Sequence, residues 1–157
     1  MTGRWSVGRS LVAEDTPRRL LLKAFEANLA SAQTGDGYRT DIGRVVTLEP
    51  GQLDPEEVDE GVAVYIERQV RATDPALLRT HRLTTVAVLV KRKALLAAEA
   101  ALDDVVDDIE RVLLNRQQSW PKGFSAPAYL EMEPLRAPAS ADWIGALLRY
   151  TSHIPIR

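Results

Sequence analysis

The chain has 157 residues, of which 45% are hydrophobic and 27% are charged, a composition that suits one compact domain and excludes a disordered or fibrous chain. It contains no cysteine and two histidines, which excludes disulfide frameworks, thiolate metal sites and cysteine nucleophiles and leaves little for imidazole chemistry. The net charge of −2 argues against general binding to nucleic acid or anionic membranes. Without a long apolar run or a signal-peptide pattern, we expect a cytoplasmic origin and no membrane partner.

Charged residues are grouped in blocks along the sequence. Residues 49–60 contain six acidic side chains and no basic one, whereas residues 61–93 contain seven basic and two acidic side chains. Residues 94–119 are acidic again, with six acidic and two basic side chains. Two interpretations remain open: the blocks are solvated faces, or they are complementary patches that meet between protein subunits.

Residues 1–14 mix glycine, serine and apolar residues without a sustained period, and we interpret them as an extended arm before a single domain over residues 15–157. Trp5 is the candidate anchor of this arm.

A helix is expected to begin at Thr16 and Pro17, because threonine caps free amides and proline fits the first helical turn. It is expected to end by residues 34–37, where two glycines favour a turn. Apolar residues recur at helical spacing in between, at Leu21, Phe25, Leu29 and Ala32.

Three strands are expected next. Residues 45–48 form a short apolar run, and residues 61–66 alternate between two faces. Residues 82–90 are rich in β-branched side chains and apolar on both faces, which indicates a central strand.

The second half of the sequence predicts a long helix and a closing hairpin. Residues 94–116 repeat apolar side chains at spacings of three and four, which is typical of an amphipathic helix. Residues 128–133 and 143–151 are expected to pair as antiparallel strands. The order helix, three strands, helix, two strands predicts an α+β fold, with a mostly antiparallel sheet of four to five strands packed against two helices.

Few residues in the sequence suggest a catalytic or ligand-binding role. The spacing of Gly35, Gly37 and Gly43 fits no phosphate-binding motif, so we interpret these glycines as turn residues. His81 and His153 lie beside predicted strands without a nucleophile motif, which favours structural roles.

Four aspartates lie one turn apart on the long helix, at Asp103, Asp104, Asp107 and Asp108. The favoured interpretation is a solvated face relieved by Arg111. A divalent cation and a basic surface of another subunit are the alternatives.

Basic residues collect at both ends of the predicted central strand: Arg68, Arg71, Arg79 and Arg82 at one end, and Lys91, Arg92 and Lys93 at the other. No aromatic residues interleave with them, which argues against single-stranded nucleic acid. These basic residues are better suited to contact an acidic protein surface, or the phosphates of a nucleic-acid duplex that passes nearby.

The run Leu20-Leu21-Leu22-Lys23-Ala24-Phe25, followed by Gly37-Tyr38-Arg39-Thr40-Asp41-Ile42-Gly43-Arg44-Val45, resembles the opening of tail terminator proteins of long-tailed bacteriophages. The order of elements is similar over most of residues 16–155. The N-terminal arm and the acidic stretch at residues 54–57 have no counterpart in the resemblance.

The resemblance implies a structural virion protein at the head-proximal end of a phage tail, assembled in the host cytoplasm. Its subunits would form a hexameric ring that caps the tail tube, ends tail polymerisation and joins the tail to the head connector. The implied partners are other copies of the chain, the tail tube protein and the connector protein, with genomic DNA passing through the ring without sequence-specific binding. Neither catalysis nor a cofactor is implied. The alternatives are another connector or head-closure protein, or a small cytoplasmic ligand-binding or enzyme domain.

A ring needs two different complementary patches on each subunit. We expect the acidic residues Glu56, Glu57, Asp59 and Glu60 of one subunit to meet Arg68, Arg71, Arg79 and Arg82 of its neighbour.

Overall fold

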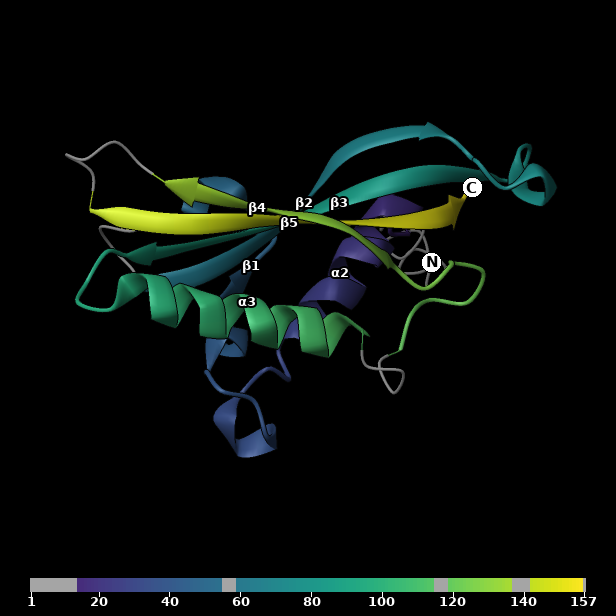
Figure 1. Cartoon of the computed structure of the whole chain (residues 1–157). Helices are drawn as coiled ribbons and strands as arrows, with labels where there is room; N and C mark the ends of the chain where they lie inside the picture. Colours follow the sequence, from purple (N-terminus) through teal and green to yellow (C-terminus); the bar gives the residue numbers. More distant parts are fainter. Residues whose placement is uncertain (1–13, 55–58, 115–118, 137–141, 157) are drawn as a thin grey trace, which may run out of the picture.

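A computed structural model describes residues 14–54, 59–114, 119–136 and 142–156. These residues form two layers, in which a five-stranded sheet carries both long helices on one face and leaves the other face without a helix (Figure 1). No helix within these ranges is long and apolar enough to cross a membrane.

The first helix, α2 (Pro17–Leu29), begins where the sequence predicts. The hydroxyl of Thr16 accepts a hydrogen bond from the amide of Arg19 at 3.2 Å, and Pro17 occupies the first turn. Leu21, Phe25 and Leu29 lie on one side of the helix and are buried. The amphipathic pattern therefore places this side against the sheet.

The sheet has the strand order β1-β2-β3-β5-β4. Its strands are β1 (Val46–Thr47), β2 (Glu60–Arg71), β3 (His81–Lys93), β4 (Ala128–Arg136) and β5 (Trp143–Pro155). The short β1 runs parallel to β2, and every other pair is antiparallel. This arrangement confirms the predicted α+β class, the central position of β3 and the closing hairpin of β4 and β5.

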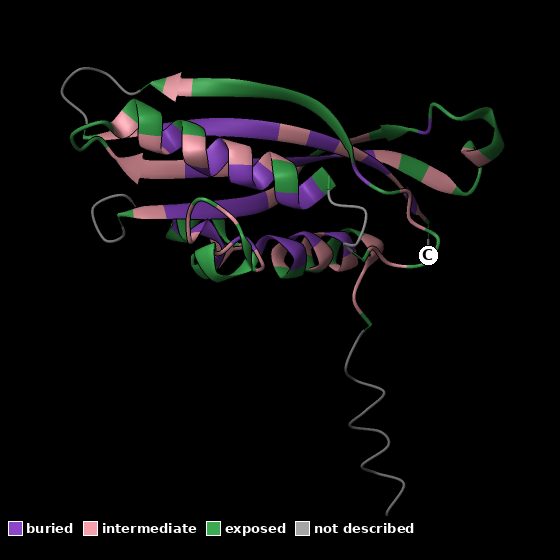
Figure 2. Cartoon of the chain, turned by 60° about the horizontal axis from the view of Figure 1, so that its bottom comes forward, coloured by how far each residue is buried: buried purple, intermediate pink, exposed green. Residues whose placement is uncertain are grey.

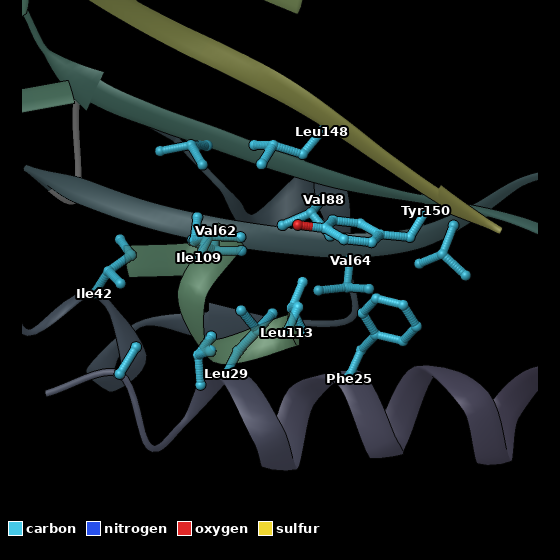
Figure 3. Packing of buried hydrophobic residues seen from close by; sticks show 14 of the residues in the cluster. Phe25, Leu29, Ile42, Val62, Val64, Val88, Ile109, Leu113, Leu148 and Tyr150 are labelled. Atoms are coloured by element: carbon cyan, nitrogen blue, oxygen red, sulfur yellow. The ribbon is translucent and has the colours of Figure 1, made fainter. Parts of the chain in front are cut away.

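The core lies between the sheet and the helices (Figure 3). The pleat sends alternate residues to the helical face, so that Val64 lies opposite Val88, which in turn lies opposite Leu148. The helix α3 (Ala98–Leu114) closes the core with apolar side chains at Leu102, Val105, Ile109, Val112 and Leu113. Burying one side chain of this size stabilises the fold by roughly 1.5–3 kcal/mol, so this layer contributes much of the stability.

Several element boundaries differ from the prediction: α2 already ends at Leu29, and β3, β4 and β5 each extend beyond their expected ranges. Two further differences have a clear cause. The long helix begins at Ala98 instead of residue 94, because Ala97 adopts a positive φ of 59° and Leu96 is fully exposed. Strand β2 continues to Arg71, beyond the predicted end at residue 66, and pairs with β3 past a bulge near Ile66. Its last residues are mostly exposed, so backbone pairing rather than core packing holds this end of the hairpin.

Candidate functional site

A buried aspartate joins α3 to the segment of residues 37–45, which carries part of the family resemblance. The side chain of Asp108 is fully buried. One carboxylate oxygen accepts the amide of Arg39 at 3.0 Å, and the other accepts the amide and the hydroxyl of Thr40 at 2.7 and 2.6 Å. Because hydrogen bonds to a charged acceptor are strong, Asp108 fixes the position of this segment on the helix.

Neighbouring side chains add contacts between the same two elements. The Nε atom of Arg39 lies 3.1 Å from the carboxylate of Asp107, and this hydrogen bond raises the pKa of Arg39. The guanidinium of Arg111 lies 5.0 Å from the centre of the Tyr38 ring, within the range of a cation–π contact. Residues 37–45 are therefore a structural part of the domain.

These contacts correct the interpretation of the four aspartates. Asp108 does not belong to a solvated face, because it is buried and saturated by donors of its own chain. Asp103 remains exposed, and Asp104 is partly exposed. In the described ranges, no group of three or more acidic, histidine or cysteine side chains is arranged to hold a metal ion.

The glycines of this segment shape its path. Gly37 has a φ of 91°, a left-handed conformation that favours glycine and fits the predicted turn. A Cβ atom on Gly43 would lie 2.5 Å from the carbonyl oxygen of Leu29, so a larger residue would push the segment off the end of α2. Asp41 closes the loop by accepting the amide of Thr34 at 2.8 Å, which lowers the pKa of Asp41.

The described residues of the acidic segment form ion pairs within their own chain. Asp59 lies 3.0 Å from Lys93, and Glu60 lies 3.1 Å from Arg92 on the adjacent strand. Burial raises the pKa of Glu60, and the charge of Arg92 opposes that rise. Three predicted interface residues lie outside the described part of the chain: Trp5, Glu56 and Glu57.

The opposite end of the β2–β3 hairpin is basic. Its four exposed arginines, which we call the basic end, are Arg68, Arg71, Arg79 and Arg82. None of them forms an ion pair with another described residue. Exposed apolar side chains accompany them, with Val70 36% and Leu78 42% exposed. Glu60 and Arg71 are the first and last residues of β2, so the acidic and basic ends lie roughly 36 Å apart.

The sheet face without helices carries a charge cluster that the sequence analysis missed. Arg149 of β5 lies 2.7 Å from Glu67 of β2, 2.7 Å from Glu131 and 3.0 Å from Glu133 of β4. The hydrogen bond to Glu67 is the main cause of a raised pKa for Arg149. The alternation of Glu131 and Glu133 in β4 is the sequence feature that could have indicated this cluster. It identifies Arg149 as the partner only when the register between β4 and β5 is known.

Strand β4 is an exposed edge of the sheet (Figure 2). Leu130 is 54% exposed, Tyr129 42% and Met132 38%. Two adjoining hollows of about 160 and 260 Å³ lie between this strand and α3 and share Met132 and Val106. We call them together the α3–β4 groove. Such an apolar edge is typical of a surface that is covered by another chain.

The two histidines hold loops and do not converge with a nucleophile. The Nε2 atom of His153 lies 3.2 Å from the amide of Thr73. His81 lies 3.0 Å from the carbonyl oxygen of Gly123. Both contacts agree with the structural roles predicted for these residues.

Comparisons with known proteins identify the fold. A solved chain from the virion of a native gene transfer agent (GTA) particle superimposes with a TM-score of 0.54 at 15% identity. The match covers 86% of this chain and 97% of that chain. No family model matches the sequence, and no curated protein matches it. At this identity the likeness shows a shared fold, and it extends over nearly the whole of both chains.

Proposed function

We propose that the chain is a structural subunit of a phage or phage-like virion. Two observations of different kinds support this: the resemblance carried by residues 37–45 and the fold shared with a chain of a gene transfer agent virion. Those residues are anchored to α3 through Asp108, so the resemblance lies in a part of the chain on which the domain depends. The proposal assigns the protein no catalytic role and no cofactor.

The more specific proposal is a tail terminator: a hexameric ring that caps the tail tube at its head-proximal end and meets the connector protein. A closed ring is built from heterologous contacts, in which one patch of a subunit meets a different patch of its neighbour. The observation that carries the proposal is the separation of charge along one hairpin. Asp59 and Glu60, the described residues of the acidic segment next to β2, lie at one end of this strand, and the basic end lies at the other.

Ring formation tests this function directly. Size-exclusion chromatography with light scattering of the purified chain, alone and with tail tube protein, should give a species of six subunits, and electron micrographs should show rings. Tubes grown with the chain present should also stop at the capped end. A chain that stays monomeric with and without tube protein would overturn the ring proposal, whereas a ring of another subunit number would favour a connector or head-closure protein.

The charge contact gives a sharper prediction. Asp59 and Glu60 have partners in their own chain, so the informative reversal is Glu56→Lys with Glu57→Lys. This variant should remain folded and lose ring formation at low salt, because two repulsive contacts would repeat at every interface. Adding Arg71→Glu and Arg79→Glu should partly restore rings, as measured by light scattering over a salt series.

A matched control reverses two acidic residues elsewhere, Glu26→Lys with Asp36→Lys, and should assemble normally. If the Glu56 and Glu57 variant assembles like this control at every salt concentration, the acidic segment is not at the contact between subunits.

A further inference from the structure

The α3–β4 groove has an apolar floor and an acidic rim. Its apolar lining residues are Leu102, Val106, Met132, Pro134 and Ala146. Its charged lining residues are Glu99, Asp103, Asp104, Asp107 and Glu110 against Arg39 and Arg136. Because acidic side chains outnumber basic ones, the groove favours an occupant that is both apolar and positively charged.

The outer edge of β4 adds backbone groups to this surface. In the described sheet β4 pairs only with β5, so the backbone groups on its other side are free for an extended segment. Pro134 has no N–H group to donate, so the uninterrupted run of backbone donors in β4 is the part of the strand before it. Leu130 and Met132 lie in that part of the strand and are exposed. An extended occupant therefore finds both backbone partners and apolar contacts.

The N-terminal arm has the matching chemistry. Residues 1–13 contain two arginines and no acidic residue. Over residues 5–11 the larger side chains Trp5, Val7, Arg9 and Leu11 alternate with serine and glycine. This short alternation gives an extended segment one large face and one small face. The large face fits a groove, and the small face allows close approach of another chain.

In its own chain only the first residues of the arm could reach this groove, because the part of the arm next to the domain lies too far away. Glu14 lines a hollow beside Pro155, at the far end of β5 from Ala146, which lines the groove. Nine residues separate Pro155 from Ala146, which is about 30 Å along a strand. Leu11 lies three residues before Glu14 and so within about 11 Å of it. The whole alternating stretch of residues 5–11 can therefore lie along the groove only if it comes from a second copy.

We propose that residues 1–13 of one copy bind in the α3–β4 groove of the next copy. The apolar side chains of the arm cover Met132 and Val106, and its arginines pair with Asp103 and Asp104 on the rim. The arm thus links neighbouring subunits. This inference rests on the proposed self-assembly of the chain, and it adds a contact separate from the one between the acidic segment and the basic end.

A peptide of residues 1–13 tests the groove without requiring a ring. Fluorescence anisotropy should show the labelled peptide binding to the full-length chain. Binding should be at least tenfold weaker to the Asp103→Lys/Asp104→Lys variant, and the Trp5→Ala peptide should also bind at least tenfold more weakly. The control variant Glu26→Lys/Asp36→Lys, which makes the same change in charge away from the groove, should bind like the wild-type chain.

The outcomes separate this inference from the proposed function. If the peptide shows no binding up to about 1 mM, or binds the groove variant and the control equally well, the inference is overturned. Ring formation, measured as above, would still stand in that case. If the circular dichroism spectrum shows that the Asp103→Lys/Asp104→Lys variant is unfolded, the Asp103→Asn/Asp104→Asn variant takes its place. For this variant we expect at least threefold weaker binding of the peptide.

Cysteine pairs identify which copy supplies the arm, because the natural chain has no cysteine. A tagged Val7→Cys chain mixed with an untagged Met132→Cys chain should form a disulfide-linked dimer under mild oxidation. Val7→Cys mixed with Leu78→Cys, an exposed site at the basic end, should not. An internal disulfide in the Val7→Cys/Met132→Cys chain at low concentration, or an equal yield with Leu78→Cys, would overturn the proposal.

Discussion

The Ile109→Asp variant is expected to melt about 10–20 °C below the wild-type chain or to be unfolded at 25 °C. Ile109 is 0% exposed and packs in the layer between α3 and the sheet (Figure 3). The substitution removes an apolar side chain from the core and adds a carboxylate without a partner, a combined cost of about 4–5 kcal/mol or more. Total stabilities are about 5–15 kcal/mol, so this is a large fraction. Thermal melting followed by circular dichroism measures the shift.

Two control variants isolate the cause. Leu114→Asp makes the same type of change on the same helix, where the side chain is 56% exposed, and should cost about 1 kcal/mol or less. Ile109→Val keeps the site apolar and should cost about 0.5–1.5 kcal/mol. A soluble Ile109→Asp protein that melts together with Leu114→Asp would mean that this side of α3 faces solvent or a partner.

The helices and strands with a periodic apolar pattern were predictable from the sequence, because packing in the core determines which of their positions are apolar. The spacing of Leu21, Phe25 and Leu29 gives α2, and the β-branched run of residues 82–90 gives the central strand. The hairpin of β4 and β5 was also predicted, and its register then places Glu131 opposite Arg149. α2, β3 and β5 each bury side chains in the core, so burial fixes their patterns, whereas β4 is an exposed edge strand.

Elements outside the core were predicted less well. Leu95 fits the apolar repeat of α3, but it lies before the helix and is 60% exposed, because the chain turns at Ala97 instead of continuing as helix. The end of β2 at Arg71 has mostly polar residues and is held by backbone pairing, which leaves no pattern of alternation. Local sequence alone does not encode these boundaries.

The candidate surfaces were only partly visible in the sequence. Counting charges located the acidic segment and the arginines of the basic end, but not the ion pairs that Asp59 and Glu60 make with β3. The largest error concerned Asp108, which looked like one more exposed acid on an amphipathic helix. Its donors are supplied by Arg39 and Thr40, 68 or 69 positions away in the chain, so no local pattern could have revealed its burial.

The Asp108→Ala variant is expected to lose about 3 kcal/mol of unfolding free energy. The carboxylate accepts three hydrogen bonds, and its removal leaves the amides of Arg39 and Thr40 without their acceptor. The segment of residues 37–45 should then detach from α3 more often. Urea unfolding measures the free energy, and hydrogen exchange should show faster exchange of these two amides.

The neighbouring aspartate is the matched control. Asp107 makes a single ion pair with Arg39, and their side chains are 43% and 62% exposed, so Asp107→Ala should cost only about 0–1 kcal/mol. The protection of the Thr40 amide should also stay unchanged, because Asp107 makes no contact with it in the described structure. Equal costs for the two substitutions would mean that Asp108 does not anchor the segment and that the resemblance lies in a loosely held loop. A large cost at Asp108 alone would instead explain why the Tyr38-Arg39-Thr40 motif and the aspartate pair on α3 belong together: the motif supplies the donors, and the helix supplies the buried charge.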